Sequence, residues 1–277
     1  MILFDANKCV SCNSCIRACP TPEANKAVQT EDGRTVYNID PEKCIRCGAC
    51  VKECSHGART YEDDTSGFWN DIKSGKQVAL LVDPSIKVAF DGCWRNVLEF
   101  LKRNGVRDIY DVSFGADICT WVHVRYLQKN PGKKLISQPC PAIVNYILKY
   151  CRDALPDLSP VQSPTLCAAI YLRKYLGVNA KLAALTPCIA KQDEFRMTGV
   201  VDYNVTFEHL GQLLEEKGFH LAEQKGKRSA FEFSGPQGIM GAIYPRPGGL
   251  KACLELEAPS LNVISSEGTD HIYHELA

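Results

Sequence analysis

The sequence lacks an excess of charge of either sign, since 32 lysines and arginines balance 32 aspartates and glutamates among its 277 residues. A formal net charge of zero gives no overall field that would attract nucleic acid or an anionic membrane. The sequence also lacks any apolar run near the roughly 18 residues of a membrane span. Its first residues, MILFDANKC, contain neither the basic nor the apolar region of a signal peptide. We therefore expect a cytoplasmic protein with no nucleic-acid or membrane partner.

Cysteine, by contrast, is abundant. Of the 15 cysteines, eight fall in the two runs CVSCNSCIRACP and CIRCGACVKECS, each with the spacing C-x2-C-x2-C-x3-C. This spacing is the known pattern of bacterial two-cluster ferredoxins, in which the last cysteine of each run binds the cluster of the other run. The pattern predicts one 4Fe-4S cluster on Cys9, Cys12, Cys15 and Cys54. It predicts a second 4Fe-4S cluster on Cys44, Cys47, Cys50 and Cys19.

The alternative interpretation of these runs is a pair of zinc sites or a disulfide-rich module. Zinc usually takes two C-x2-C pairs, and a third cysteine at the same interval in both runs does not suit it. Pro20 follows the first run as the ferredoxin pattern requires, whereas Ser55 replaces the second proline. His56 is expected to be exposed or to cap a turn. Because free thiolates need a reducing compartment, and oxygen attacks exposed clusters, we expect an anaerobic or oxygen-shielded host.

The length exceeds one typical domain and fits two or three structural units. Residues 1–60 are predicted to form an α+β ferredoxin-like dicluster domain, with a hairpin turn at 32–33 and a strand over 35–39. Residues 61–77 are polar and predict a linker with a short helix. In residues 78–277, extended segments alternate with helices of about ten residues, which predicts an α/β domain. Strands are expected at 78–90 (broken by a turn), 106–112, 135–137 and 180–185, and helices near 94–103, 117–128, 141–151, 164–177, 206–218 and 250–255.

Seven cysteines lie outside the two runs. For isolated cytosolic cysteines the simplest interpretation is a small buried apolar residue, and it applies to Cys93, Cys119, Cys151, Cys167 and Cys253. Cys140 and Cys188 differ, because each follows a proline at the expected end of a strand and precedes a helix. A helix N-terminus lowers a thiol pKa, and open α/β sheets bind ligands where their strands end. From the residues alone, a metal site and a structural role are about equally supported.

The segments around Cys140 and Cys188 also resemble a known family. QPCPAIVNY and TPCIAKQDEF resemble the first two signature motifs of the iron-only (FeFe) hydrogenase large subunit, and DVSFGADI, LSPVQSP and GIMGAIYPRPGGLKA resemble other segments of that family in the same order. The resemblance implies a hydrogenase-like α/β domain of two lobes around a catalytic H-cluster, which is a 4Fe-4S cluster joined to a di-iron unit. It implies that Cys140 and Cys188 bind the 4Fe-4S half and that Lys191 contacts the di-iron unit. Pro187 and Ser159 are the implied cofactor-binding neighbours.

Several positions depart from the catalytic members of that family. Pro139 stands where they carry a cysteine that passes protons, and His123 and Tyr126 stand where they carry two relay glutamates. Ser159 keeps the expected hydroxyl, and Thr186 stands where many members have a methionine. These departures resemble the sensory branch of the family, and they imply hydrogen sensing or low activity.

The family's third motif, which carries two more cysteines, would follow LNVISSEGTDHIYHELA, and no such motif is present. We therefore expect either a domain truncated at its C-terminus or a degenerate site. The first functional hypothesis is a hydrogenase-like oxidoreductase, for hydrogen oxidation or proton reduction, whose two clusters connect an H-cluster to a redox partner protein or a downstream signalling domain. The alternative is a non-catalytic two-cluster electron carrier on a degenerate hydrogenase-like scaffold.

Overall fold

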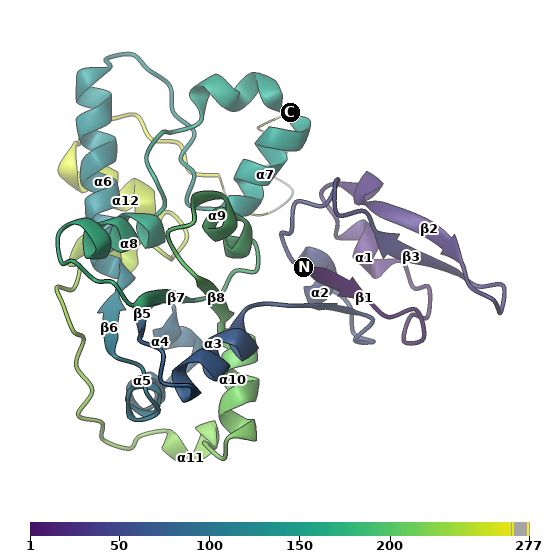
Figure 1. Cartoon of the computed structure of the whole chain (residues 1–277). Helices are drawn as coiled ribbons and strands as arrows, with labels where there is room; N and C mark the ends of the chain where they lie inside the picture. Colours follow the sequence, from purple (N-terminus) through teal and green to yellow (C-terminus); the bar gives the residue numbers. More distant parts are fainter. Residues whose placement is uncertain (267, 269–275, 277) are drawn as a thin grey trace. The chain divides into compact units, whose positions relative to one another are not determined.

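The computed structural model describes residues 1–266, 268 and 276, and the chain divides into two compact units (Figure 1). The first unit contains Met1–Glu62 and Cys140–Pro156, together with the described residues from 266 onward. The second unit contains Asp63–Pro139 and Asp157–Ser265. Each unit has its own sheets, and they are described separately.

The first unit contains two small antiparallel sheets. β1 (Ile2–Phe4) pairs with β4 (Arg59–Tyr61), and β2 (Asn25–Gln29) pairs with β3 (Thr35–Ile39). The predicted hairpin is confirmed, and Gly33 in its turn has a φ of 81°, which glycine adopts at little cost. The helical segments of this unit are α1 (Ser14–Arg17), η1 (Pro22–Ala24), α2 (Ala49–Lys52), α7 (Pro141–Tyr150) and most of η2 (Arg152–Asp157).

Helix α7 groups with the first unit, whereas the sequence placed it in the second domain. The buried Asn145 amide donates to the carbonyl of Ile45 at 3.2 Å, and the Lys149 ammonium donates to the carbonyl of Cys44 at 2.8 Å. These contacts join segments about a hundred residues apart, so no local pattern reveals them. The division predicted from the sequence therefore differs from the one that the contacts define.

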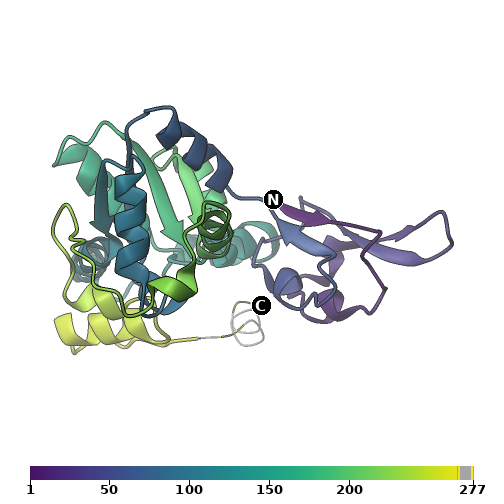
Figure 2. The same cartoon turned by 90° about the horizontal axis from the view of Figure 1, so that it is seen from below.

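The second unit is built on a four-stranded parallel sheet with the order β6-β5-β7-β8. Its strands are β5 (Val78–Val82), β6 (Asp108–Asp111), β7 (Lys181–Thr186) and β8 (Tyr203–Thr206). Every residue of β5 is buried, as expected for a parallel strand covered on both faces. Figures 1 and 2 show helices on both faces of this sheet. The predicted α/β architecture is confirmed for this unit.

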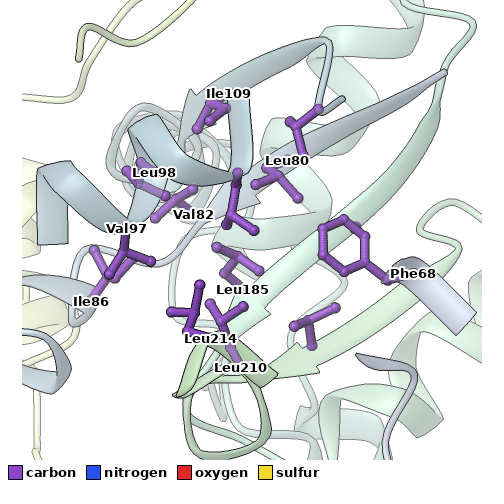
Figure 3. Close-up of a cluster of buried hydrophobic side chains, with 14 of the residues drawn as sticks. Phe68, Leu80, Val82, Ile86, Val97, Leu98, Ile109, Leu185, Leu210 and Leu214 are labelled. Atoms are coloured by element: carbon purple, nitrogen blue, oxygen red, sulfur yellow. The ribbon is translucent and has the colours of Figure 1, made fainter. Parts of the chain in front are cut away.

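Alternate side chains of β5 enter two different cores. Leu80 and Val82 point to one face, where they pack with residues of α3 (Thr65–Lys73), α5 (Trp94–Arg103) and α10 (Phe207–Glu216), as Figure 3 shows. Ala79 and Leu81 point to the other face and pack against α6 (Val112–Lys129), α8 (Pro164–Lys174) and α9 (Lys191–Thr198). The remaining helical segments are α4 (Ile86–Ala89), α11 (Leu221–Gln224), η3 (Met240–Ile243) and α12 (Gly249–Glu257).

The short helix expected within residues 61–77 is α3, and its Phe68, Trp69 and Ile72 form a buried stripe that packs into the core. Two other local expectations were wrong. The second extended piece after β5 is the short helix α4. The strand expected at 135–137 is a single bridge from Ile136 to Leu158 outside the sheet. The last residues of the sequence, up to Ala277, also have the pattern expected of a helix, but they fall mostly on residues 267 and 269–275, outside the described residues.

Within the described part of the chain, no helix is both long enough and apolar enough to cross a membrane.

Candidate metal centres

The first set of predicted ligands converges on one cavity of the first unit. Cys9, Cys12, Cys15 and Cys54 all line it. Phe4, Tyr37 and Arg59 complete much of its wall, and the exposed His56 stands at its edge. Four thiols around one space form a donor set that fits an iron–sulfur cluster.

The backbone explains how each cysteine run curls around a centre. Ser11 and Arg46 occupy the same position in their runs, between the first two cysteines, and both have a left-handed φ, of 57° and 60°. Asn13 and Gly48 are also equivalent, with φ of 62° and 82°, and each is the N-cap of a short helix. A left-handed conformation costs a non-glycine residue about 1–2 kcal/mol. Its repetition in both runs indicates a conformation imposed by the same ligand geometry.

The second set of predicted ligands is also brought together. The charges of Cys19 and Cys44 contribute to the raised pKa values of Cys47 and Cys50, so these four thiols lie within electrostatic range of one another. Burial is the main cause of the shift, and it raises the pKa of Cys47 to about 11 and that of Cys50 to about 12. Thiolates at such positions need a positive centre among them, because metal binding and thiol deprotonation are coupled. This donor set also fits a cluster.

Cys140 lies in the first unit beside this second set. It is exposed at the N-cap of α7, and its charge contributes to the raised pKa of Cys47. The contacts of Asn145 and Lys149 hold α7 against the second cysteine run, and thereby fix Cys140 near it. Because residues 135–137 form no sheet strand, the predicted order of strand, Pro-Cys and helix holds only for Cys188.

Cys188 lies in the second unit, in the loop between β7 and α9. Its carbonyl accepts a hydrogen bond from the fully buried Asn204 amide at 2.9 Å, and its backbone N–H donates to Thr186 Oγ1 at 3.2 Å. The Thr186 hydroxyl lies 2.9 Å from Asn204 Oδ1. The loop is therefore held by the next strand, at the edge of the sheet where open α/β folds bind ligands. Pro187 is exposed in the same loop.

Lys191 is the first residue of α9 and is 7% exposed. Its ammonium forms an ion pair with Glu194 at 2.7 Å, and both side chains are largely buried. Its charge also reaches Asp83, which follows β5. Burial raises the pKa of Asp83, while hydrogen bonds from Ser85 and the charge of Lys191 lower it in part. Lys191 therefore supplies a positive charge near the carboxyl ends of the parallel strands.

Two of the four positions compared with the family's proton relay meet in the second unit. His123 Nε2 lies 3.1 Å from Ser159 Oγ, and both residues are buried. His123 Nδ1 lies 2.9 Å from the carbonyl of Cys119 and 3.6 Å from its sulfur. Burial lowers the pKa of His123, but its bonds to Cys119 outweigh that effect and raise it overall. Tyr126 is half-buried and forms no side-chain hydrogen bond within the described residues.

Two residues with a possible role at these sites, Cys119 and Arg59, were not predicted from the sequence. Cys119 is buried as expected, but it is not inert: hydrogen bonds from the Cys167 thiol, then from His123 and Tyr244, hold its pKa below the usual range despite burial. The spacing of Cys119 and His123, four residues apart on one helix, could have indicated this contact. Arg59, which lines the first cavity, had no local signal.

Comparison with known proteins explains this combination of parts. Residues 76–271 match the family model "Iron only hydrogenase large subunit, C-terminal domain", which covers more than half of the chain. The chain belongs to the iron-only hydrogenase large-subunit family. Residues 1–55 match the 4Fe-4S dicluster domain. The chain therefore carries the two-cluster ferredoxin region and the hydrogenase-like domain that the sequence predicted. No curated protein matches it.

The solved structures that resemble the chain are FeFe-hydrogenases. One, from work on oxygen inactivation of the H-cluster, has a TM-score of 0.55 and 20% identity and covers 75% of this chain and 61% of its own. A variant of apo HydA1 from Chlamydomonas reinhardtii has a TM-score of 0.54 and 20% identity, covering 75% and 62%. This similarity shows a shared fold. The chain spans about three fifths of the length of these structures.

Proposed function

We propose that this family member is an iron–sulfur oxidoreductase in which two 4Fe-4S clusters pass electrons to or from an H-cluster-type site. The first set of four cysteines would hold one cluster, the second set would hold the other, and Cys140 and Cys188 would bind the H-cluster. The single observation that carries this proposal is the position of Cys140. Asn145 and Lys149 of α7 donate to backbone carbonyls of the second cysteine run, and Cys140 is the N-cap of that helix, so the proposed H-cluster ligand belongs to the same unit as the proposed ligands of the second cluster.

The chain's own residues prepare each of these sites. Asn145 and Lys149 hold α7, and with it Cys140, against the second cysteine run. Asn204 and Thr186 hold the loop of Cys188. When bound, the clusters supply one-electron transfer. Lys191, buried beside that loop and paired with Glu194, would be the hydrogen-bond donor to an anionic ligand.

We further propose that the protein senses hydrogen or turns it over slowly. Pro139 has no proton to transfer at the position where catalytic relatives use a cysteine. The contact between His123 and Ser159 retains a proton-carrying pair, since an imidazole titrates near neutral pH. The missing step next to Pro139 limits how fast protons reach the site. The partner would be a redox protein or a downstream signalling domain in a reducing, cytoplasmic compartment.

The test is a comparison of the full chain with the double variant Cys140→Ser/Cys188→Ser. Both proteins would be prepared without oxygen together with the maturation machinery of an FeFe-hydrogenase. We expect the wild type to contain more iron than two 4Fe-4S clusters require and to show infrared bands of iron-bound carbonyl and cyanide. The double variant should retain the two clusters and lose both the extra iron and the bands.

The alternative function, a non-catalytic two-cluster electron carrier, predicts a different result. Iron content would then equal that of two clusters in the wild type and in the double variant alike, and neither would show the infrared bands. That result would refute the H-cluster proposal and leave the ferredoxin-type clusters in place.

A further inference from the structure

Arg59 places a buried positive charge at the first cysteine cavity. It is the first residue of β4, pairs with Phe4 of β1, and is 2% exposed. Its guanidinium carbon lies 4.9 Å from the centre of the Phe4 ring, and the side chain lines the cavity with Cys9, Cys12, Cys15 and Cys54. The charge is therefore enclosed between an aromatic ring and a set of thiols.

The hydrogen bonds of Arg59 leave part of the guanidinium unused. Nη2 lies 3.2 Å from Asn25 Oδ1 and 3.7 Å from Cys15 Sγ, and it also donates to the carbonyl of Tyr37. Nη1 is buried and has no hydrogen-bond partner in the described part of the chain. Nor does any carboxylate among the described residues form an ion pair with Arg59. Its protein neighbours are an amide, a carbonyl, an aromatic ring and a thiol, all of them neutral.

A buried charge without a counter-ion is strongly unfavourable. The four cysteines in the same cavity provide the missing negative charge when they are thiolates bound to an iron–sulfur core. Each N–H of a guanidinium is a donor, and a hydrogen bond to an ionised acceptor is stronger than one to a neutral group. The orphaned Nη1 and the contact with Cys15 therefore both indicate an anionic acceptor in the cavity.

The cations near the second set of cysteines are placed differently. Lys149 is exposed, and its ammonium reaches the carbonyl of Cys44 rather than a sulfur. Arg46 is half-buried and contacts Cys44 Sγ through its backbone N–H at 3.4 Å. The charge of Arg59 also extends to Cys50, without a direct bond. Solvent screens exposed charges much more than buried ones, so the two sites differ in the charge that acts on them.

We propose that Arg59 donates hydrogen bonds to the cluster held by Cys9, Cys12, Cys15 and Cys54 and raises its reduction potential above that of the second cluster. This inference rests on the proposed cluster sites. One-electron reduction adds one negative charge to a cluster, and a nearby buried cation stabilises that charge. Cluster potentials respond to net charge and to hydrogen bonds at the sulfurs. The first cluster would accordingly be reduced before the second when an external reductant supplies electrons.

The test is a redox titration of the full chain, with dithionite as reductant, followed by electron paramagnetic resonance. Arg59→Gln removes the charge, and Arg59→Lys keeps it on a different donor. We expect Arg59→Gln to lower the reduction equilibrium constant of one cluster at least tenfold, which is 59 mV for one electron, and to change that of the other less than threefold. Arg59→Lys should retain part of the wild-type value.

Arg17→Gln is the matched control. Arg17 is exposed and donates to the carbonyl of Cys12 at 3.2 Å, so its charge lies near the same cavity but in solvent. We expect a change below threefold for both clusters. Equal shifts of both clusters in Arg59→Gln, or no shift of either, would overturn the role of Arg59. Iron content and the number of electron paramagnetic resonance signals in the wild type show whether the two clusters are present. A failure of the proposed cluster sites can therefore be distinguished from a failure of the proposed role of Arg59.

A second measurement covers the case in which Arg59→Gln does not retain its clusters. In wild-type protein containing arginine labelled with nitrogen-15 in the guanidinium, hyperfine spectroscopy of the reduced state should detect a coupled nitrogen at one cluster. The coupling should persist in Arg17→Gln and disappear in Arg59→Lys. Its absence from the wild type, or its persistence in Arg59→Lys, would contradict the proposal.

Discussion

Replacement of Asn204 by alanine should loosen the loop that carries Cys188. The Asn204 amide donates to the Cys188 carbonyl and accepts from the Thr186 hydroxyl, both at 2.9 Å, and the side chain is fully buried. Alanine leaves both groups without that partner, and each such buried group costs about 1–3 kcal/mol. However, the Thr186 hydroxyl lies 3.2 Å from the Cys188 carbonyl and can then donate to it. We therefore expect the free energy of unfolding to fall by about 2 kcal/mol, near the lower end of the summed cost of the two groups.

Urea unfolding followed by tryptophan fluorescence measures this loss. All three tryptophans, Trp69, Trp94 and Trp121, belong to the second unit, so the signal reports on the unit that contains Asn204. A shift of the midpoint at constant slope would give the change in the free energy of unfolding. Asn130→Ala is the control, because Asn130 is exposed, and its side chain donates to the Tyr126 carbonyl; we expect a change within about 0.5 kcal/mol. A loss below about 1 kcal/mol for Asn204→Ala would refute the reasoning.

Three further predictions concern other contacts. Gly115→Ala should destabilise the second unit by about 1–3 kcal/mol in the same urea assay, because the new Cβ would lie 2.2 Å from the carbonyl oxygen of Pro164. His209→Gln should flatten the pH dependence of stability above pH 6.5. A hydrogen bond to Asp63 raises the pKa of His209 in the folded protein. The stability that this bond contributes is therefore complete below pH 6.5 and is lost as pH rises through the raised pKa. Asn145→Ala removes a hydrogen bond worth about 1 kcal/mol and should speed iron loss to a chelator about fivefold.

The controls for the glycine and histidine predictions are residues of the same type that are less tightly packed or more exposed. Gly67→Ala meets its nearest atom at 3.8 Å, within a helix, and should be neutral or stabilising. A loss as large as that of Gly115→Ala would contradict the packing argument. His220→Gln removes an exposed histidine that pairs with Glu215 and should change the pH dependence less than His209→Gln. For Asn145→Ala, an iron-release rate equal to the wild-type rate would show that α7 does not protect the second cysteine run.

Much of the fold follows from local patterns. The buried run of β5 predicts a parallel strand covered on both faces, and the one-sided apolar pattern of 94–103 predicts α5. Both elements lie where expected. A short helix was also expected where α3 lies, but its part in the core was not, because three apolar residues in a polar stretch give a weak periodic signal. Phe68 and Ile72 nevertheless belong to the buried core. The assignment of individual cysteines to the two clusters and to the H-cluster remains a prediction.

By itself, the sequence determined the chemistry available to this protein. The spacing of eight cysteines predicts two clusters because consecutive thiols must reach different irons, and the two motifs around Cys140 and Cys188 predict the family. Only the tertiary structure decided which distant residues act on these sites. It brought Arg59 to Cys15, Asn145 to Ile45, and His123 to Ser159, which are separated by 44, 100 and 36 residues. Ligand spacing and periodicity are local properties of the chain, whereas burial of a charge and satisfaction of a distant carbonyl arise only when segments pack together.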